Sequence, residues 1–178
     1  IEMTGDDEDV QFTTHYPNLN SHSDIYSPTF NPHYSIHEYA IEWEPGIVRW
    51  FIDGELVNVQ DQPFVQGLIY PMNLMMNLWA AEAVGWVGQW DPSVMPQESI
   101  YEYVKVYDYT PGSGDYGTND NFTLRWSDSF LSLDSSKWTA TRNGGFDGNY
   151  CKFKPIAVRV EDGNLYLSIQ DPPPIDLI

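Results

Sequence analysis

The sequence predicts an all-β fold, and three observations favour that class. Apolar and polar residues alternate along several short segments, as they do in strands that bury one face. Aromatic residues make up 15% of the 178 residues, and aromatic side chains favour strands. The 13 Gly and 13 Pro supply the turns that many short strands require. Short strands at this spacing indicate a β-sandwich or jelly roll, and the length suits one domain.

The predicted elements begin with a hairpin. Residues 39–43 and 48–52 alternate in polarity, and Glu44-Pro45-Gly46 lies between them as a turn. Asp53-Gly54-Glu55 predicts the turn that follows. Further strands are predicted at Met72–Leu78, Ser99–Tyr109, Phe122–Phe130, Ala157–Glu161 and Asn164–Ile169. Residues from about 110 to 120 are rich in Gly, Ser and Asp and have no apolar period, which predicts a flexible linker.

The formal net charge of -18 limits the classes of partner. Phosphate would be repelled, so nucleic acid and anionic membrane surfaces are not expected as partners. A neutral substrate meets no such repulsion. The single cysteine, Cys151, predicts no internal disulfide and no zinc site, and a small buried thiol is the simplest interpretation.

The tryptophans divide into two groups. Trp43 and Trp50 alternate with apolar neighbours on predicted strands, which favours a place in the core. Three others lie in a segment rich in Gly and Ala: Trp79, Trp86 and Trp90. Indole rings can stack on the apolar C–H faces of sugar rings, while nearby polar side chains bind the hydroxyls. Candidates for that polar role are Asn77, Glu82 and Gln89. From these residues alone, a sugar platform and a local core remain equally open.

Several longer segments resemble one family. "IHEYAIEWEPGIVRWFIDGELV", "MMNLW" and "YVKVYDYTPG" are similar to glycoside hydrolase family 16, whose members include endo-β-glucanases on a curved jelly roll. The resemblance continues through "FTLRWSDSFLSLDSSKW", "FDGN" and "EDGNLYLSI". In most members these last segments come first, whereas here they follow the Gly-rich stretch. That order resembles the circularly permuted 1,3-1,4-β-glucanases (lichenases) of the family.

The resemblance implies a fold and an activity. The expected fold is a circularly permuted jelly-roll β-sandwich of two curved antiparallel sheets. We expect residues 1–178 to form a single, incomplete domain with its junction at about 110–120. The implied activity is endo-acting, retaining hydrolysis of mixed-linkage β-1,3-1,4-glucan. We also expect secretion, because the substrate is a polymer.

The family's catalytic signature, E-x-D-x-E, places three carboxylates on one face of a strand because strand side chains alternate. Ile1-Glu2-Met3-Thr4-Gly5 matches only the end of this motif, so the resemblance makes Glu2 the acid/base. The nucleophilic Glu and the assisting Asp would lie before residue 1. Retention needs two carboxyl groups roughly 5–5.5 Å apart. We therefore expect the remaining carboxylates on an upstream segment or a companion fragment.

The resemblance also implies the residues that bind the glucan. Trp79 and Trp86 would stack on sugar rings, whereas a role for Trp90 stays open. Side chains expected to bind hydroxyls are Gln11, Asn77 and Asn149. Asn149 lies on a loop that could equally be a turn satisfied by Asp and Asn. His37 matches a family histidine and is expected to be structural.

Many family members hold a structural Ca²⁺. By position, the resemblance implies a site built from the side chain of Glu102 and the backbone carbonyls of Ser129 and Gly163. Oxygen ligands suit this hard cation. Glu102 as a solvated strand residue remains the alternative. No cofactor is expected for catalysis.

Two other functions stay open at this point. A β-1,3-glucanase (laminarinase) shares the chemistry and usually carries an extra residue in the catalytic strand. A non-catalytic glucan-binding module would keep the aromatic residues and lack the nucleophile. An E-x-D sequence running into Ile1-Glu2 would distinguish an enzyme from such a module.

Overall fold

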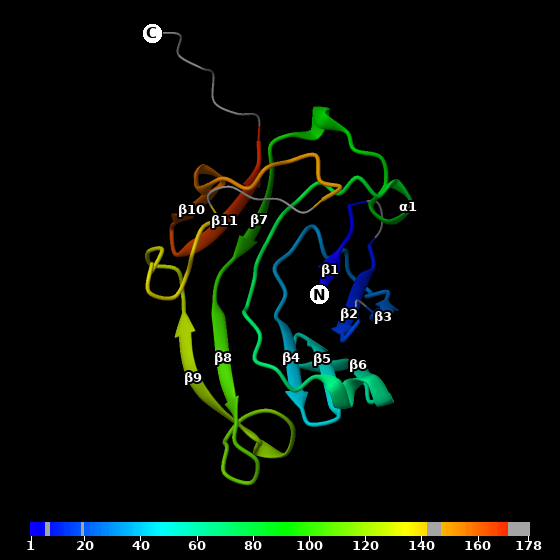
Figure 1. Ribbon diagram of the computed structural model, residues 1–178. Helices are drawn as coiled ribbons and strands as arrows, with labels where there is room; N and C mark the ends of the chain where they lie inside the picture. Colours follow the sequence, from blue (N-terminus) through cyan, green and yellow to red (C-terminus); the bar gives the residue numbers. More distant parts are fainter. Residues whose placement is uncertain (6–7, 19, 142–146, 171–178) are drawn as a thin grey trace. The chain divides into compact units, whose positions relative to one another are not determined.

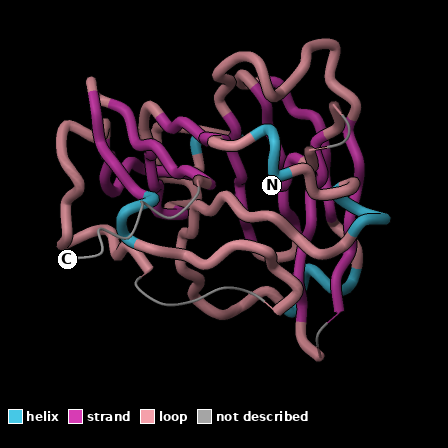
Figure 2. The backbone as a smooth tube through the Cα atoms, turned by 90° about the horizontal axis from the view of Figure 1, so that it is seen from above, coloured by secondary structure: helices cyan, strands magenta, loops and turns pink. Residues whose placement is uncertain are grey.

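The computed structural model describes residues 1–5, 8–18, 20–141 and 147–170 (Figure 1). The chain divides into two compact units. Unit 1 contains Ile1–Leu74 and Val106–Trp126, and unit 2 contains Met75–Lys105 and Ser127–Ile178. Magenta strands far outnumber the short cyan helices in Figure 2, and every strand pairing that carries a register is antiparallel. These antiparallel sheets confirm the predicted all-β fold of the jelly-roll kind.

Unit 1 contains two three-stranded antiparallel sheets. The strands of the first sheet, in spatial order, are β1 (Glu2–Met3), β2 (Val10–Tyr16) and β3 (Asn20–Tyr26). Those of the second are β4 (Tyr39–Glu44), β5 (Ile47–Ile52) and β6 (Glu55–Gln60). The predicted hairpin is confirmed, with Trp43 opposite Val48 in its register. Asp53 and Gly54 join β5 to β6 at φ values of 50° and 78°, which a tight hairpin turn requires.

The core of unit 1 follows from strand alternation. The residues buried together are Val10, Phe12, Val48, Trp50, Ile52 and Val65. Val65 comes from the 3₁₀ helix η1 (Pro63–Gly67). The rings of Phe12 and Trp50 stack with centroids 5.2 Å apart. Each large apolar side chain buried in this way contributes about 1.5–3 kcal/mol. The core position predicted for Trp50 is confirmed, and Trp43 packs half-buried against the same cluster.

One predicted strand is divided in two, and its second half forms a hairpin with the next strand across the Gly-rich stretch. Ser99–Tyr109 is not one strand but two, β7 (Gln97–Tyr101) and β8 (Val104–Tyr109), because residues 102–103 join neither ladder. β8 pairs with β9 (Phe122–Asp128), which ends two residues before the predicted Phe130. Between them, Thr110 N–H donates to the Asn121 carbonyl at 2.7 Å, and η3 (Thr118–Asp120) completes the loop. The stretch predicted as a linker therefore carries backbone hydrogen bonds that close this hairpin.

Unit 2 is built around the antiparallel sheet β10 (Val158–Glu161), β11 (Asn164–Ile169) and β7. The prediction of a strand at Asn164–Ile169 is confirmed. β10 starts one residue later than predicted, because the 3₁₀ helix η4 (Pro155–Ala157) precedes it. Leu165 and Ile169 are buried beneath the sheet. The remaining elements of the unit are one turn of helix, α1 (Val84–Val87), and the 3₁₀ helix η2 (Pro92–Val94).

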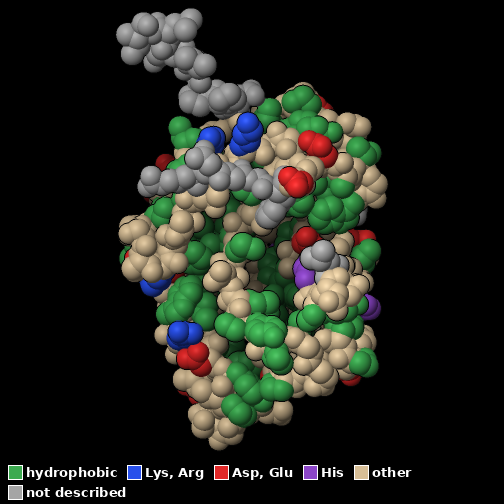
Figure 3. All heavy atoms as spheres, viewed as in Figure 1, with side chains coloured by type: hydrophobic (Ala, Val, Ile, Leu, Met, Phe, Trp, Pro, Cys, Tyr) green, Lys and Arg blue, Asp and Glu red, His purple; other side chains and the backbone are tan. Residues whose placement is uncertain are grey.

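The strand predicted at Met72–Leu78 is not formed, so this prediction is wrong. These residues alternate as a strand would, but a strand also needs a partner for its backbone groups, and no described strand pairs with them. We call residues 69–74 the exposed apolar segment, since Ile69 is 71% exposed and Met72 is 66% exposed. Apolar side chains also reach the surface widely on the face that Figure 3 shows.

Among the described residues, no helix has the length and apolar character needed to cross a membrane.

Candidate functional site

The candidate acid/base lies on the edge strand of unit 1. β1 pairs with β2 so that Glu2 is opposite Gln11. Glu2 Oε2 accepts a hydrogen bond from Thr13 Oγ1 at 3.0 Å and a longer one from Gln11 Nε2 at 3.4 Å. The carboxylate is half-buried, so it is fixed by neighbours and still reaches solvent. The structure therefore brings together the side chains of Glu2 and Gln11.

The hydrogen bonds extend across three strands. Gln11 Nε2 also lies 2.9 Å from Thr13 Oγ1 and 3.2 Å from Ser23 Oγ, and the two hydroxyls are 3.0 Å apart. The amide has two hydrogens for three acceptors in reach, so its contact with Glu2, the longest, is the weakest. We call these residues the Glu2 network: Glu2, Gln11, Thr13 and Ser23. Their hydroxyl and amide donors orient a carboxylate, which suits proton transfer at a fixed place.

Strand alternation explains why the network forms here. Gln11 and Thr13 are two residues apart on β2, so they share a face, while Val10, Phe12 and Thr14 point to the buried side. Thr13 and Ser23 were not singled out from the sequence. The polar positions in V-Q-F-T-T on the strand beside Glu2 are the signal that could have identified Thr13.

Two of the predicted platform residues meet in unit 2. Trp79 precedes the buried Ala80 and Ala81, and Trp86 lies in α1. Their rings pack edge to face, with centroids 6.0 Å apart and planes inclined by 61°. Both side chains are half-buried. The arrangement leaves ring surface accessible while fixing the orientation of each indole.

Asn149 is bridged to the segment that follows Trp79. A β-bridge joins Ala81 to Asn149, and Tyr150 N–H donates to the Ala80 carbonyl at 2.8 Å. Asn149 Oδ1 accepts from Cys151 N–H at 3.1 Å, which is the turn that the sequence left as an alternative. Its Nδ2 is shielded from solvent and has no acceptor among the described residues. Asn149 thus uses its Oδ1 in the turn, and its Nδ2 donates to no described residue. The other predicted amide, Asn77, is exposed.

Trp90 has a partner that the sequence did not indicate. Its ring lies nearly parallel to that of Tyr150, with an interplanar angle of 17° and centroids 6.3 Å apart. Tyr150 is 51% exposed and Trp90 is half-buried. Because their backbones are 60 residues apart in the sequence, no local pattern could have paired them.

Of the residues expected to hold calcium, Ser129 and Gly163 lie close to each other. The turn at Gly163 (φ 74°) comes close to β9's end, since a Cβ built on this glycine would lie 4.0 Å from the Ser129 carbonyl oxygen. Glu102 is exposed in the break between β7 and β8. The described residues contain no group of three or more His, Cys, Asp or Glu suited to a metal. The backbone part of the expected oxygen set fits a hard cation, which binds carbonyls readily.

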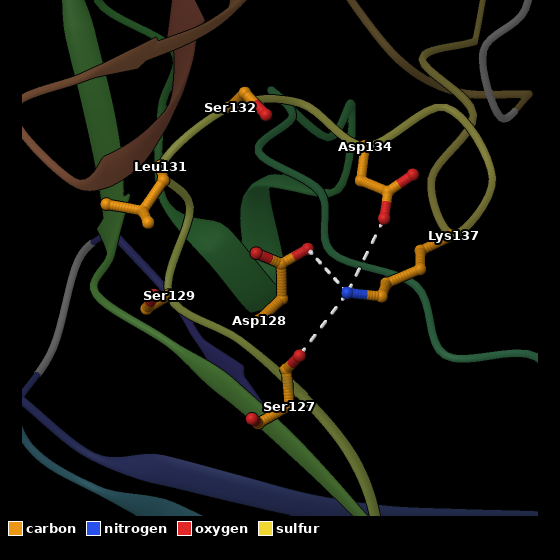
Figure 4. Close-up of a pocket in the computed structure, with 7 residues that line it drawn as sticks. All are labelled: Ser127, Asp128, Ser129, Leu131, Ser132, Asp134 and Lys137. Carbon is orange, nitrogen blue, oxygen red and sulfur yellow. Dashed lines mark hydrogen bonds and ion pairs between the residues drawn. The ribbon is translucent and has the colours of Figure 1, made fainter.

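A pocket of about 280 Å³ adjoins Ser129 and is lined mainly by polar residues (Figure 4). Lys137 Nζ points into it, 3.4 Å from the Ser127 carbonyl and 3.5 Å from Asp134 Oδ2. Hydrogen bonds from the Ser136 hydroxyl and N–H hold the pKa of Asp134 below its ordinary value. The lysine ammonium already pairs with both acidic side chains of this pocket, which indicates a structural role.

His37 has the structural role that the sequence predicts. Its Nδ1 lies 2.6 Å from Asp53 Oδ2, its Nε2 lies 2.8 Å from Ser35 Oγ, and its ring stacks on Phe30. The hydrogen bond with His37 lowers the pKa of Asp53. With both ring nitrogens engaged, His37 anchors the turn between β5 and β6.

Comparisons with known proteins place these features in context. Residues 1–101 match the model of a family described as glycosyl hydrolases family 16. A β-glucanase from Fibrobacter succinogenes is 38% identical over 135 residues, which are 76% of this chain and 38% of that protein. A β-glucanase from Paenibacillus polymyxa is 32% identical over 107 residues, or 59% of this chain and 43% of the relative. A β-glucanase from Brevibacillus brevis is 32% identical over 113 residues, which are 62% of this chain and 41% of that protein. The chain thus spans less than half the length of these curated relatives.

Proposed function

The chain belongs to glycosyl hydrolases family 16, and on that premise we propose that it acts as an endo-acting, retaining β-glucanase on mixed-linkage β-1,3-1,4-glucan. The observation that carries the proposal is the Glu2 network, in which Thr13 and Gln11 orient a half-buried carboxylate within the matched region. The relatives named β-glucanases support the substrate class. The net charge of -18 also suits a neutral polymer better than a polyanion.

In the proposed mechanism Glu2 first acts as the acid. It gives its proton to the glycosidic oxygen as that bond breaks, while a second carboxylate attacks the anomeric carbon and forms a glucosyl-enzyme. Glu2, now ionised, takes a proton from the water that attacks the same carbon, so the nucleophilic carboxylate leaves that carbon and the configuration is retained. Thr13 and Gln11 position Glu2 for both steps.

The attacking carboxylate and the glucan contacts complete the proposal. We place the nucleophile and an assisting Asp on a polypeptide segment that precedes Ile1 or on a companion fragment, in a permuted domain with its junction at about 110–120. Trp79 and Trp86 stack on glucose rings. The amides of Gln11, Asn77 and Asn149 bind hydroxyls. Such an enzyme would be secreted to reach its substrate.

The role of Glu2 can be tested with Glu2→Ala in the natural full-length protein. Without the acid, hydrolysis of barley β-glucan should fall by about 10²- to 10⁴-fold. A dinitrophenyl glucan oligosaccharide needs no protonation of its leaving group, so it should still form the glucosyl-enzyme. Azide should then accelerate turnover and give a β-glucosyl azide, because an anion attacks without a base. Equal losses on both substrates, with no azide product, would show that Glu2 is not the acid/base.

A substrate panel separates the other candidate functions. Faster cleavage of barley β-glucan and lichenan than of laminarin is expected of a mixed-linkage enzyme. Preference for laminarin would favour the β-1,3-glucanase. Binding of glucan with no release of reducing ends, from wild-type protein and Glu2→Ala alike, would favour the non-catalytic module.

We also propose a structural Ca²⁺ held by the Glu102 carboxylate and the carbonyls of Ser129 and Gly163. Calcium bound to the folded state stabilises it, so chelation should lower the melting temperature and added Ca²⁺ should restore it. Glu102→Gln should remove most of this response, whereas Glu55→Gln, at an exposed strand start in unit 1, should leave it intact. A melting temperature that ignores both chelator and calcium would contradict the proposal.

A further inference from the structure

The rings of Trp90 and Tyr150 form a second aromatic pair in unit 2, separate from Trp79 and Trp86. The two rings have nearly the same orientation, with planes 17° apart and centroids separated by 6.3 Å. About half of the Tyr150 surface is accessible to solvent. Stacked rings hold each other in a fixed orientation, so the exposed part of Tyr150 is an apolar ring surface whose ordering costs little on binding.

Several contacts fix where this pair lies. The bridge between Ala81 and Asn149 and the hydrogen bond from Tyr150 N–H to the Ala80 carbonyl tie Tyr150 to the segment that follows Trp79. On the other side, Gly88 ends α1 with φ 77°, a conformation that glycine adopts without strain, and the chain then turns toward Trp90. Trp79, Trp86 and Trp90 thus lie along one backbone segment, and Tyr150 lies on the segment that is bridged to it.

The polar residues around the pair indicate the chemistry of its ligand. Gln89 and Asp91 flank Trp90 in sequence, and Asp147 and Asn149 precede Tyr150. Of these, Gln89, Asp91 and Asp147 are exposed. Carboxylates and amides accept hydrogen bonds from hydroxyls, whereas an anionic ligand would be repelled. An exposed aromatic ring with such acceptors next to it in the sequence matches a neutral pyranose ring.

We propose that Trp90 and Tyr150 form a second sugar-binding platform, which takes a glucose ring of the glucan chain beyond the rings bound by Trp79 and Trp86. The inference rests on the proposed function, because the ligand is the same polysaccharide. It adds a subsite that makes binding depend on the length of the glucan. A merely structural pair would affect stability without any dependence on ligand length.

The test measures binding of the natural full-length protein to barley β-glucan in native gels and to oligosaccharides of increasing length by titration. The variants are Trp90→Ala, Tyr150→Ala and Tyr150→Leu, of which the last keeps apolar volume without a ring. Trp90→Phe and Tyr150→Phe keep an aromatic ring. Tyr116→Ala is the matched control, since Tyr116 is 48% exposed and stacks on Tyr107 in unit 1.

We expect loss of either ring to weaken binding of the polymer about 3- to 10-fold and to leave binding of the shortest bound oligosaccharide unchanged. The phenylalanine variants should bind nearly as wild type, and Tyr116→Ala should bind as wild type. Melting temperatures show that each variant is folded, and Tyr150→Leu keeps the test decisive if an alanine variant unfolds.

Three outcomes would overturn the platform, and they differ in what else they affect. If Trp79→Ala loses glucan binding while the Trp90 and Tyr150 variants bind all lengths as wild type, the platform is absent and the proposed function stands. If wild-type protein binds no β-glucan of any length, both the platform and the proposed function fail. A uniform loss at every length would identify Trp90 and Tyr150 as structural.

Discussion

Gln60 shows how a single polar residue organises the interior of unit 1. The side chain is fully buried on β6. Its Oε1 accepts from the Thr14 hydroxyl, and its Nε2 donates to the Phe12 carbonyl at 3.2 Å and to Asp24 Oδ2 at 2.9 Å. Burial opposes ionisation of Asp24, yet hydrogen bonds from Asn58 and Gln60 outweigh it and lower the pKa of that carboxyl. One amide on β6 therefore satisfies groups on two other strands, β2 and β3.

Replacing this amide should be costly. Gln60→Met keeps the volume but removes the hydrogen bonds to Thr14 and the Phe12 carbonyl and one of the donors to Asp24, so we expect a loss of about 2–4 kcal/mol in the free energy of unfolding. Urea denaturation measures the change. Gln89→Met, on an exposed glutamine, should alter stability by about 0.5 kcal/mol or less. Equal effects from the two variants would show that the buried hydrogen bonds contribute little.

The sequence motifs predicted some residues of the candidate site, and the other residues were identified from contacts in the structure. Glu2, Gln11, Trp79 and Trp86 belong to motifs, so the resemblance could assign them before any geometry was known. Thr13, Ser23 and Tyr150 belong to no motif. Their importance arises from strand register or from a contact across a long stretch of sequence, which a reading of neighbouring residues does not reveal.

At the scale of elements, the β4–β5 hairpin carries a nearly buried group of charges. Arg49 Nη1 lies 3.0 Å from Glu44 Oε1 and 3.7 Å from Glu42 Oε2, and the three side chains are between 11% and 16% exposed. Glu42 Oε1 also accepts from Thr118 N–H at 2.8 Å, where the loop after β8 meets the hairpin. The glycine before it, Gly117, has φ 73°, and a Cβ there would lie 2.5 Å from Glu42 Oε1. The hairpin and the loop depend on each other through this carboxylate.

Removing the cation should destabilise the hairpin strongly. Arg49→Met leaves two poorly solvated carboxylates facing each other, and we expect a loss of about 3–5 kcal/mol in unfolding free energy. The control is Arg125→Met, because Arg125 and Asp108 form a pair 3.6 Å apart with side chains 63% and 56% exposed. Such a surface pair contributes about 0.5 kcal/mol or less. Chemical denaturation of both variants gives the comparison, and a small effect at Arg49 would contradict this account.

Strand prediction succeeded where a partner strand is also present. Residues 39–44 and 47–52 alternate and meet across a two-residue turn, and Asn164–Ile169 pairs on both sides. Met72–Leu78 alternates equally well and forms no strand. Alternation reports which side chains could share a face, but a ladder also needs backbone groups opposite it, and a single segment contains no information about them.

At the scale of the whole molecule, acidity and apolar exposure oppose each other. The net charge is -18 and the isoelectric point is about 4.1. In the exposed apolar segment, Tyr70 is 70% exposed and Leu74 is 52% exposed, and adjacent backbone groups join no ladder. Apolar residues with unpaired backbone favour association between chains, while a large net charge disfavours it.

The balance between charge repulsion and apolar association should therefore depend on pH. Light scattering of the 178-residue chain should stay low at pH 7 and rise steeply as the pH falls toward 4, where the net charge vanishes. Met72→Glu should reduce the scattering near pH 5, because it places a charge within the exposed apolar segment. Tyr34→Glu, at a residue that is 87% exposed outside that segment, should reduce it much less. Equal protection by both variants would assign the effect to net charge alone.

β2 has a consequence for how this protein can change over evolutionary time. Its alternate residues contribute to two different properties, since Val10, Phe12 and Thr14 face the interior while Gln11 and Thr13 contact Glu2. A saturation library of this strand, scored separately for abundance and for glucan hydrolysis, should show tolerance that alternates with a period of two. Selection can then modify the chemistry at odd-numbered positions without first repairing the packing at even-numbered ones.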